Sequence, residues 1–256
     1  TVSRSPNCGK VEIDSVEGMD HIPINLPVDP EKNTATAGLV QLLHDVGDPF
    51  GFKVRISKGI PLGSGLGGSA ASAVAGVVAA NALLFRPLTE IDLMKYALIG
   101  ERVASGAKHG DNVGPSLFGG LVLVTEVEPP RIVRIPSPKN LYAVVIHPPI
   151  LIETRAARAM LRLDVPLKGH VQQLARLGGF IAGCYRGDLQ MIQENLADGL
   201  IEPQRSSLIK GFQQVKTAAL RAGALGCSIS GSGPAVFALA HDERVGPVSA
   251  AMLKAF

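Results

Sequence analysis

The residues best suited to chemistry form a glycine-rich segment at positions 61–72, which reads Pro-Leu-Gly-Ser-Gly-Leu-Gly-Gly-Ser-Ala-Ala-Ser. It lies between an expected strand and an expected helix, so free backbone N–H groups and the positive end of the helix dipole meet at one place. Glycines keep side chains away from those amides and permit positive φ angles. We therefore expect an anion site that cradles phosphates; the alternative is a tight strand-to-helix turn with close packing.

Three better-known glycine loops do not fit this segment. Gly63, Gly65 and Gly68 spell GxGxxG, but a dinucleotide site also requires a strand ending in an acid about 20 residues later, where a helix is expected. A Walker A loop requires Gly-Lys-Ser/Thr, and no Lys occurs between Gly59 and Phe85. A protein kinase requires HRD and DFG sequences, and the chain contains neither.

Polar residues near this segment and beyond it are candidates for the rest of a site that binds phosphates. Ser69 stands at the start of the expected helix, where its hydroxyl can bind Mg²⁺, a cation that prefers oxygen ligands. Ser72, one turn later, is expected to hydrogen-bond its own helix. His109, Asp111 and Asn112 are expected in a loop between a helix and a strand, where polar groups often serve a site; a surface turn is the alternative.

Two arginines are candidates for binding a carboxylate, because each guanidinium can donate two parallel hydrogen bonds. Arg158 follows Thr154 by four positions, so the two share a helix face, and Arg205 stands at an expected helix boundary. Solvated surface arginines are the alternative. A lone His or Cys is more often packed than reactive, and we expect structural roles for Lys58, His147 and Cys184.

Mixed strands and helices must position these residues, which predicts an α/β (α+β) protein. Apolar alternation and turn signals predict strands within 1–16 and at 51–57, 118–124 (buried), 141–146, 226–229 and 235–239, the last two as a hairpin. Amphipathic or small-residue patterns predict helices at 34–44, 69–84, 154–161, 170–185, 188–197 and 208–222. Another helix is expected to begin at Thr89, with Asp92 completing a capping box.

A Pro-rich stretch at 128–138 is the best linker, and it predicts two domains, 1–137 and 138–256. The alternating pattern is already established in the first residues, and the final helical pattern stops without a Gly or Pro signal. We therefore expect the first domain to be truncated at its start and the second at its end.

Composition excludes several classes of protein. Hydrophobic residues make up 46% of the 256 residues, which excludes a disordered chain. A net charge of +3 without a basic cluster, and 4% aromatic residues, argue against nucleic-acid binding. Three cysteines without a CxxC pair argue against a disulfide framework or zinc site and favour a reducing compartment. The longest near-apolar run, 70–85, is too short to cross a membrane.

The glycine-rich segment carries the signature PxGxGLGxSAAS, and it resembles the GHMP kinase superfamily together with ERVASGAKHGDNVGPSLFGG at 101–120 and SISGSGPAVFAL at 228–239. The His-Gly-Asp-Asn run, HPPILIETRAAR at 147–158 and Glu-Pro-Gln-Arg at 202–205 are most similar to the homoserine kinase family. The implied fold has an N-terminal nucleotide-binding ribosomal-protein-S5-domain-2-like domain and a C-terminal ferredoxin-like domain. Members also carry an N-terminal asparagine and aspartate motif, and nothing before Gly9 matches it.

The resemblance implies ATP and Mg²⁺ as cofactors and L-homoserine as the substrate, in threonine biosynthesis. The implied catalytic residues are Ser69 and Glu101, as metal ligands, and Asn112. The implied substrate-binding residues are His109, Asp111, Asn112, Thr154, Arg158, Arg205 and Gly231. The implied ATP-binding residues are Asn33, Pro61, Leu62, Gly63, Ser64, Gly65, Leu66, Gly67, Gly68, Ser69, Ala70, Ala71 and Ser72. A helix N-cap would equally explain Asn33.

Several alternatives remain at this point. The preferred mechanism is positioning of the substrate together with electrostatic stabilisation by Mg²⁺. The alternative mechanism has Asp111 acting as a base. Another GHMP kinase, of the mevalonate or shikimate type, and a non-catalytic nucleotide-binding relative are the competing functions. Two arginines and the His-Gly-Asp-Asn run favour an amino-acid substrate, and Ser69 with Glu101 argues against a pure binder. We expect a homodimer in the cytoplasm, or in the plastid stroma of a plant.

Overall fold

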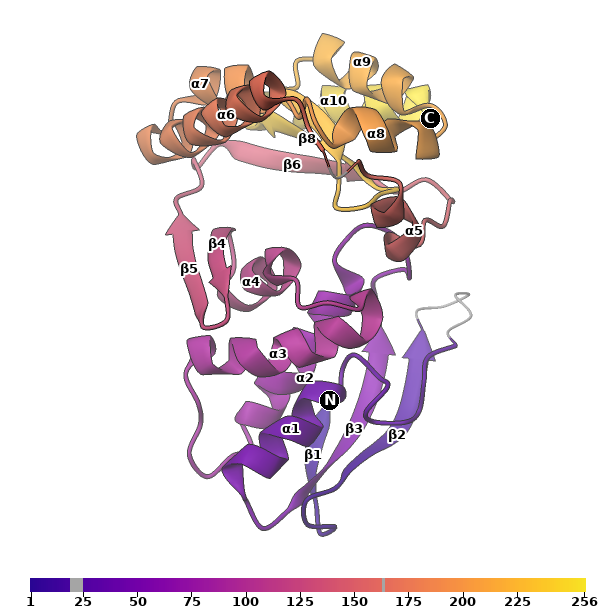
Figure 1. Ribbon diagram of the computed structural model, residues 1–256. Coiled ribbons are helices and arrows are strands. Elements are labelled where there is room, and N and C mark those ends of the chain that lie inside the picture. The colour runs from indigo at the N-terminus through magenta and orange to yellow at the C-terminus, as the bar shows by residue number, and fades with distance from the viewer. Residues whose placement is uncertain (19–24, 163) are drawn as a thin grey trace. The chain divides into compact units, whose positions relative to one another are not determined.

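The strand predicted at 51–57 is the centre of a three-stranded sheet (Figure 1). The computed structural model describes residues 1–18, 25–162 and 164–256, without the side chains of 154 and 155. In sheet order the strands are β1 (Val2–Ser5), β3 (Gly51–Lys58) and β2 (Val11–Gly18). β1 pairs with β3 antiparallel and β2 pairs with it parallel. Every second residue of β3 from Phe52 to Lys58 is buried, so one face of the sheet is the core face.

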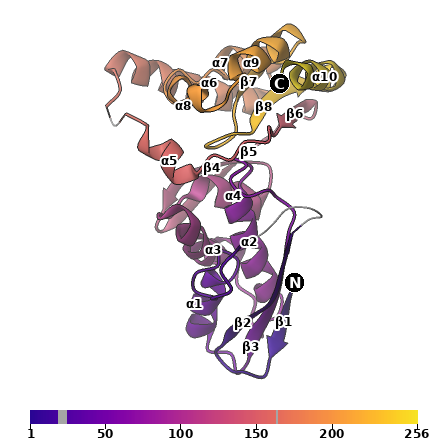
Figure 2. The same cartoon turned by 90° about the vertical axis from the view of Figure 1, so that its right-hand side faces the viewer.

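Three helices cover that face of the sheet (Figure 2). They are α1 (Ala37–Val46), α2 (Gly68–Asn81) and α3 (Glu90–Ser105). The small residues of α2 allow close packing: a Cβ on Gly76 would lie 2.0 Å from the backbone oxygen of Ala35. The Thr89 side chain accepts a hydrogen bond from the Asp92 amide and donates one to its carboxylate, which confirms the predicted cap.

The segment after α3 differs from its prediction. Helix α4 (Gly110–Phe118) precedes a two-stranded hairpin of β4 (Leu121–Val127) and β5 (Pro130–Ile135). The strand predicted at 118–124 was wrong in its start and its burial: Phe118 ends α4, Gly119 and Gly120 follow with positive φ, and β4 is only partly buried. Most of the linker predicted at 128–138 forms the turn and second strand of this hairpin, but the boundary between the two compact units of the chain, between Arg134 and Ile135, does lie within it.

A second sheet carries the C-terminal half, and its predicted hairpin is confirmed. Its strands in sheet order are β6 (Leu141–Ile146), β8 (Val236–His241) and β7 (Gly226–Ile229), all antiparallel. Two helices pack on its apolar face, α9 (Phe212–Arg221) and α10 (Val245–Ala255). The remaining helices are α5 (Thr154–Ala159), α6 (Leu167–Arg186), α7 (Leu189–Asn195), α8 (Glu202–Arg205) and the short 3₁₀ turns Ser206–Leu208 and Asp242–Arg244.

Contacts divide the described chain into two units. Unit 1 comprises Thr1–Pro61 and Gly67–Arg134, and unit 2 comprises Leu62–Leu66 and Ile135–Phe256. The division falls inside the glycine-rich segment, whose first part packs with unit 2 and whose second part begins α2 in unit 1. The assignment of 1–137 to a nucleotide-binding domain and of 138–256 to a C-terminal domain stays a prediction.

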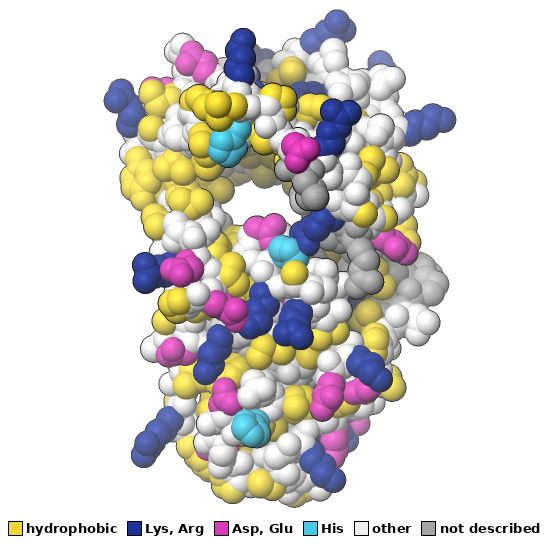
Figure 3. Space-filling model, in the orientation of Figure 1, with side chains coloured by type: hydrophobic (Ala, Val, Ile, Leu, Met, Phe, Trp, Pro, Cys, Tyr) yellow, Lys and Arg dark blue, Asp and Glu magenta, His cyan; other side chains and the backbone are white. Residues whose placement is uncertain are grey.

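Charged side chains of both signs share the surface, and the cysteines differ in exposure. On the face in Figure 3, Lys and Arg side chains are interspersed with Asp and Glu side chains. All three cysteines are free thiols; Cys8 is exposed, whereas Cys184 and Cys227 are buried. Among the described helices, none combines the length and the apolar character needed to cross a bilayer.

Candidate functional site

Helix α2 begins with an end suited to an anion. Gly67 precedes it in the left-handed conformation, with φ +67°, and the amides of Gly68, Ser69 and Ala70 have no acceptor inside the helix. The first turn carries no acidic side chain, so the positive end of the helix dipole stays available to a ligand. Ala70 is fully buried, so its side chain belongs to the core and only its amide can serve a ligand.

A serine and a buried carboxylate lie side by side at this end. Ser69 Oγ donates a hydrogen bond to Glu101 Oε2 at 2.8 Å, and Glu101 is 6% exposed. Burial raises the pKa of Glu101 above its ordinary value of 4.5, against the hydrogen bonds from Ser69 and Ser105. Both side chains offer the oxygen ligands that Mg²⁺ prefers, and a cation would relieve the cost of the buried charge. Their role as metal ligands stays a prediction.

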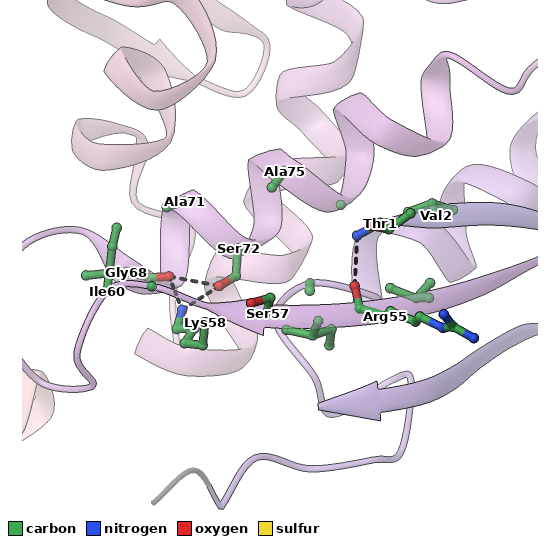
Figure 4. A pocket seen from close by; sticks show the side chains of 15 residues that line it. Thr1, Val2, Arg55, Ser57, Lys58, Ile60, Gly68, Ala71, Ser72 and Ala75 are labelled. Carbon is green, nitrogen blue, oxygen red and sulfur yellow. Dashed lines mark hydrogen bonds between the residues drawn. The ribbon is translucent and has the colours of Figure 1, made fainter. Parts of the chain in front are cut away.

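Lys58 belongs to the same group, and its contacts fit the structural role that was predicted for it. Its ammonium donates to the carbonyl of Gly68 and to Ser72 Oγ (Figure 4). Ser72 Oγ also donates to Gly68 O at 3.0 Å, which confirms the bond to its own helix. Burial lowers the pKa of Lys58, and the charge of Glu101 opposes that shift. Position 58 continues the buried alternation of β3.

A cavity of about 170 Å³ opens beside Lys58 (Figure 4). Strand β3 and the first three turns of α2 form much of its wall, and the wall is largely apolar. The lining residues include Val54, Ile56, Ile60, Ala71 and Ala75. Because Gly68 and Ser72 also line it, the cavity adjoins the helix end described above.

Asp111 and Asn112 lie in the first turn of α4, so the predicted loop at these positions was wrong. Two glycines of this helix, Gly110 and Gly114, serve close packing. A Cβ on Gly110 or on Gly114 would lie 2.8 Å from the side chain of Val124 on β4. His109 is the residue that precedes the helix.

The start of α4 adjoins the Ser69–Glu101 pair. His109 Nδ1 lies 3.1 Å from Ser105 Oγ, and Ser105 Oγ donates to the backbone oxygen of Glu101 at 3.0 Å. A Cβ on Gly67 would lie 3.2 Å from Asn112 Oδ1, so this amide faces the end of the glycine-rich segment. Unit 1 therefore gathers the predicted residues Ser69, Glu101, His109, Asp111 and Asn112.

The side chain of Asn33 is buried and hydrogen-bonded to nearby backbone groups. It is 2% exposed; its Oδ1 accepts from the Ala35 amide at 3.0 Å and its Nδ2 donates to Pro27 O at 2.7 Å. Thr36 precedes the first residue of α1 but makes no side-chain cap. Asn33 makes the bonds expected of a cap for the turn leading into the helix, because its Oδ1 accepts from the Ala35 amide and its carbonyl accepts from the Ala37 amide at 2.9 Å. Its contact with ATP stays a prediction.

In unit 2, the first part of the glycine-rich segment packs against the turn between β7 and β8. Gly65 has φ +76°, and a Cβ there would lie 2.6 Å from the backbone oxygens of Ser230 and Gly233. Gly65 O accepts from Ser230 Oγ at 2.8 Å, and Ser64 O accepts from the Ala235 amide at 3.1 Å. The glycine-rich segment at 61–72 and the motif at 228–239 thus contact each other, largely through backbone atoms. A side chain at position 65 would collide with these atoms, so only glycine fits there.

Two predicted substrate residues, Arg205 and Gly231, contact each other in unit 2, and a third, Arg158, follows a residue that Arg205 also contacts. Arg205, at the end of α8, donates from Nη1 to Gly231 O at 3.0 Å and from Nε to Ala157 O at 3.4 Å. Arg158 is exposed in the last turn of α5, next to Ala157 in the chain. Gly231 has φ +57°. The side chain of Thr154 lies outside the described residues, so the face it was expected to share with Arg158 stays a prediction.

Comparisons with known proteins place this geometry in a family. The family model "GHMP kinases N terminal domain" matches residues 33–120, and "GHMP kinases C terminal" matches residues 180–256. The homoserine kinase of Xylella fastidiosa strain 9a5c is 48% identical over 230 residues, which cover 90% of this chain and 70% of that protein. The chain belongs to the homoserine kinase family of the GHMP kinases.

Further relatives of the homoserine kinase family agree with this. The homoserine kinase of Chlorobium phaeobacteroides strain BS1 is 41% identical over 238 residues, 90% of this chain and 74% of that protein. The crystal structure of homoserine kinase from Cytophaga hutchinsonii ATCC 33406 matches with a TM-score of 0.94 at 44% identity, covering 100% of this chain and 80% of that chain. These matches confirm the GHMP kinase fold, and membership of a kinase family implies the use of ATP.

Proposed function

We propose that the chain transfers the γ-phosphoryl group of ATP to the side-chain hydroxyl of L-homoserine, giving O-phospho-L-homoserine and ADP for threonine biosynthesis. The observation that carries the substrate is the 48% identity to a homoserine kinase over 90% of the chain. The hydrogen-bonded Ser69–Glu101 pair supports catalysis rather than nucleotide binding alone, because a pure binder has no need of a metal ligand set.

The start of α2 would bind the phosphates of ATP. The left-handed Gly67 and the amides that follow it offer donors to phosphate oxygens, and the helix dipole favours their charge. The apolar cavity beside Lys58 would hold the adenine, because it adjoins those donors and buries a flat apolar group. The ammonium of Lys58 would keep Gly68 and Ser72 in place at the boundary of the two subsites.

Ser69 and Glu101 would hold Mg²⁺. One hydroxyl and one carboxylate fit this ion, since Mg²⁺ keeps several waters and takes few protein ligands. When bound, the ion would offset negative charge on the transferring phosphoryl group. The hydrogen bond between Ser69 and Glu101 fixes the two donors together.

Each unit offers polar groups suited to binding the substrate. In unit 2, Arg158 and Arg205 suit its carboxylate, and Thr154 and the backbone at Gly231 would also contact it. In unit 1, His109, Asp111 and Asn112 would do so. Positioning supplies much of the rate of phosphoryl transfer, since little covalent work falls to the protein. Asp111, exposed at the start of α4, is the alternative as a base.

The location and the assembly complete the proposal. Three free thiols fit a reducing compartment such as the cytoplasm. A homodimer is supported by an exposed apolar stripe on α6, where helical spacing aligns Leu167, Val171, Leu174 and Tyr185. Light scattering on the purified protein measures the assembly: a mass of one chain would contradict the dimer.

A substrate panel tests the proposed activity. The protein is assayed for ADP release with Mg·ATP and homoserine, mevalonate, shikimate or galactose. We expect turnover with homoserine alone, and its loss in Glu101→Ala. Turnover with another alcohol would keep the fold and overturn the substrate. ATP binding without turnover of any alcohol would overturn catalysis.

A further inference from the structure

A buried ion pair in unit 2 lies outside the residues assigned so far. Glu202, the first residue of α8, is 7% exposed. Its Oε1 pairs with Lys216 Nζ on α9, and its Oε2 accepts a hydrogen bond from Ser228 Oγ on β7 at 2.7 Å. The two side chains of the pair are 8% and 22% exposed. Burying two charges carries a desolvation cost that often cancels their attraction, so stability alone is a weak reason for this pair.

The same helical turn carries Arg205 at its other end. Glu202 and Arg205 are three positions apart in α8, so the two lie on one turn of helix. The start of the turn is held by the Glu202 carboxylate and by its amide, which donates to Asp198 Oδ2 at 3.1 Å. The far end is held by the Arg205 guanidinium on the carbonyls of Ala157 and Gly231.

The contact with β7 connects Glu202 to the turn that Arg205 touches. Ser228 lies on β7 just before the turn, which is closed by the Ser230 amide donating to Ala235 O at 2.8 Å. One carboxylate thus fixes both α8 and the base of this turn. Movement of the carboxylate would displace the guanidinium and the Gly231 carbonyl together.

We propose that Glu202 and Lys216 are positioning residues that set Arg205 and the Gly231 turn for the carboxylate of the amino-acid substrate. This rests on the proposed function, in which Arg205 binds that carboxylate. Neither positioning residue touches the substrate, so both act through the guanidinium. Their loss should weaken substrate binding and leave the nucleotide site of unit 1 unchanged.

The test is a double-mutant cycle that combines Glu202→Gln with Arg205→Ala. The KM values for homoserine and for ATP are measured for each protein. Glu202→Gln keeps the size of the side chain and removes the ion pair, so we expect the KM for homoserine to rise about tenfold, the value of one charged hydrogen bond. The KM for ATP should stay within twofold. In an Arg205→Ala background, Glu202→Gln should cause little further rise in the KM for homoserine, because the guanidinium that Glu202 positions is already absent. Glu194→Gln, an exposed acid on α7, is the matched control and should leave both constants unchanged.

A paired replacement separates positioning from stability. Glu202→Leu with Lys216→Met removes both charges, which commonly restores thermal stability, and the KM for homoserine should nevertheless stay raised. Recovery of that KM together with the Tm, or an undiminished effect of Glu202→Gln in the Arg205→Ala background, would overturn the inference. Wild-type protein that does not phosphorylate homoserine would overturn the proposed function, and the inference with it.

Discussion

Replacing Glu101 by glutamine should abolish most of the activity and stabilise the protein without ligands. The variant keeps the size of the side chain and an oxygen that can accept from Ser69 Oγ, which now lies 2.8 Å from the carboxylate. It removes the buried negative charge. We expect kcat to fall by about 10² to 10³, the typical effect of losing one group that stabilises transition-state charge.

The stability change follows from the pKa of Glu101, which burial raises above 4.5. A carboxyl with a raised pKa binds its proton more tightly in the folded state. Its stabilising contribution is full below pH 4.5 and is lost as the pH rises through the raised pKa. At pH 8 the wild type therefore bears a penalty that Glu101→Gln lacks. We therefore expect Glu101→Gln to have a higher Tm than the wild type at pH 8 and no gain in Tm near pH 4.

The assay combines thermal unfolding of the ligand-free protein between pH 4 and pH 8 with turnover at saturating Mg·ATP. Glu90→Gln is the matched control, because Glu90 lies on the same helix but is exposed and paired with Arg134. It should retain kcat and show no pH-dependent gain in Tm. A Glu101→Gln variant that keeps its kcat within threefold, or that loses stability at pH 8, would refute the reasoning.

Three further outcomes are expected. Gly65→Ala should lower the free energy of unfolding in urea by about 2 kcal/mol or more, because its φ is +76° and a Cβ would meet two carbonyl oxygens at 2.6 Å. Arg205→Lys should raise the KM for homoserine about tenfold, but not that for ATP, because lysine cannot reproduce the guanidinium fork. A thiol reagent should modify one cysteine of the native protein at pH 8, the exposed Cys8, because burial raises the pKa of Cys227 to about 12.

Each of these outcomes has a clear counter-result. An unfolding free energy of Gly65→Ala equal to the wild type would mean that the segment does not pack as described. Equal changes in both Michaelis constants of Arg205→Lys would indicate a general loss of structure. Rapid modification of more than one thiol in the folded protein would contradict the burial of Cys184 and Cys227.

The sequence predicts the elements whose signals are local. Alternating apolar residues predicted β3, and the capping residue Thr89 predicted the start of α3. Both signals come from residues that are close together in the chain. The glycine pattern likewise predicted positive φ angles, which Gly63, Gly65 and Gly67 adopt.

Errors arose where glycine and proline serve packing. The loop expected at His109, Asp111 and Asn112 is the start of α4. Gly110 and Gly114 let that helix approach Val124 on β4, a contact between different elements. The Pro-rich stretch after β4 was predicted as a linker; it contains the boundary between the two units, but much of it is strand β5, which pairs with β4. Such packing contacts leave no local pattern in one sequence.

Lys58 has the structural role that was predicted for it. Its position continues the buried face of β3. The structure buries it because the Gly68 carbonyl and Ser72 receive its hydrogen bonds.

The most direct test of the account is the fate of the γ-phosphorus, followed by ³¹P NMR with ATP, Mg²⁺ and L-homoserine. For the wild type we predict a phosphomonoester signal that grows as ATP is consumed and matches synthetic O-phospho-L-homoserine. For Glu101→Gln that signal should be absent on the same time scale. Release of inorganic phosphate without the ester, or equal ester formation by both proteins, would contradict the assignment of Ser69 and Glu101 to phosphoryl transfer onto homoserine.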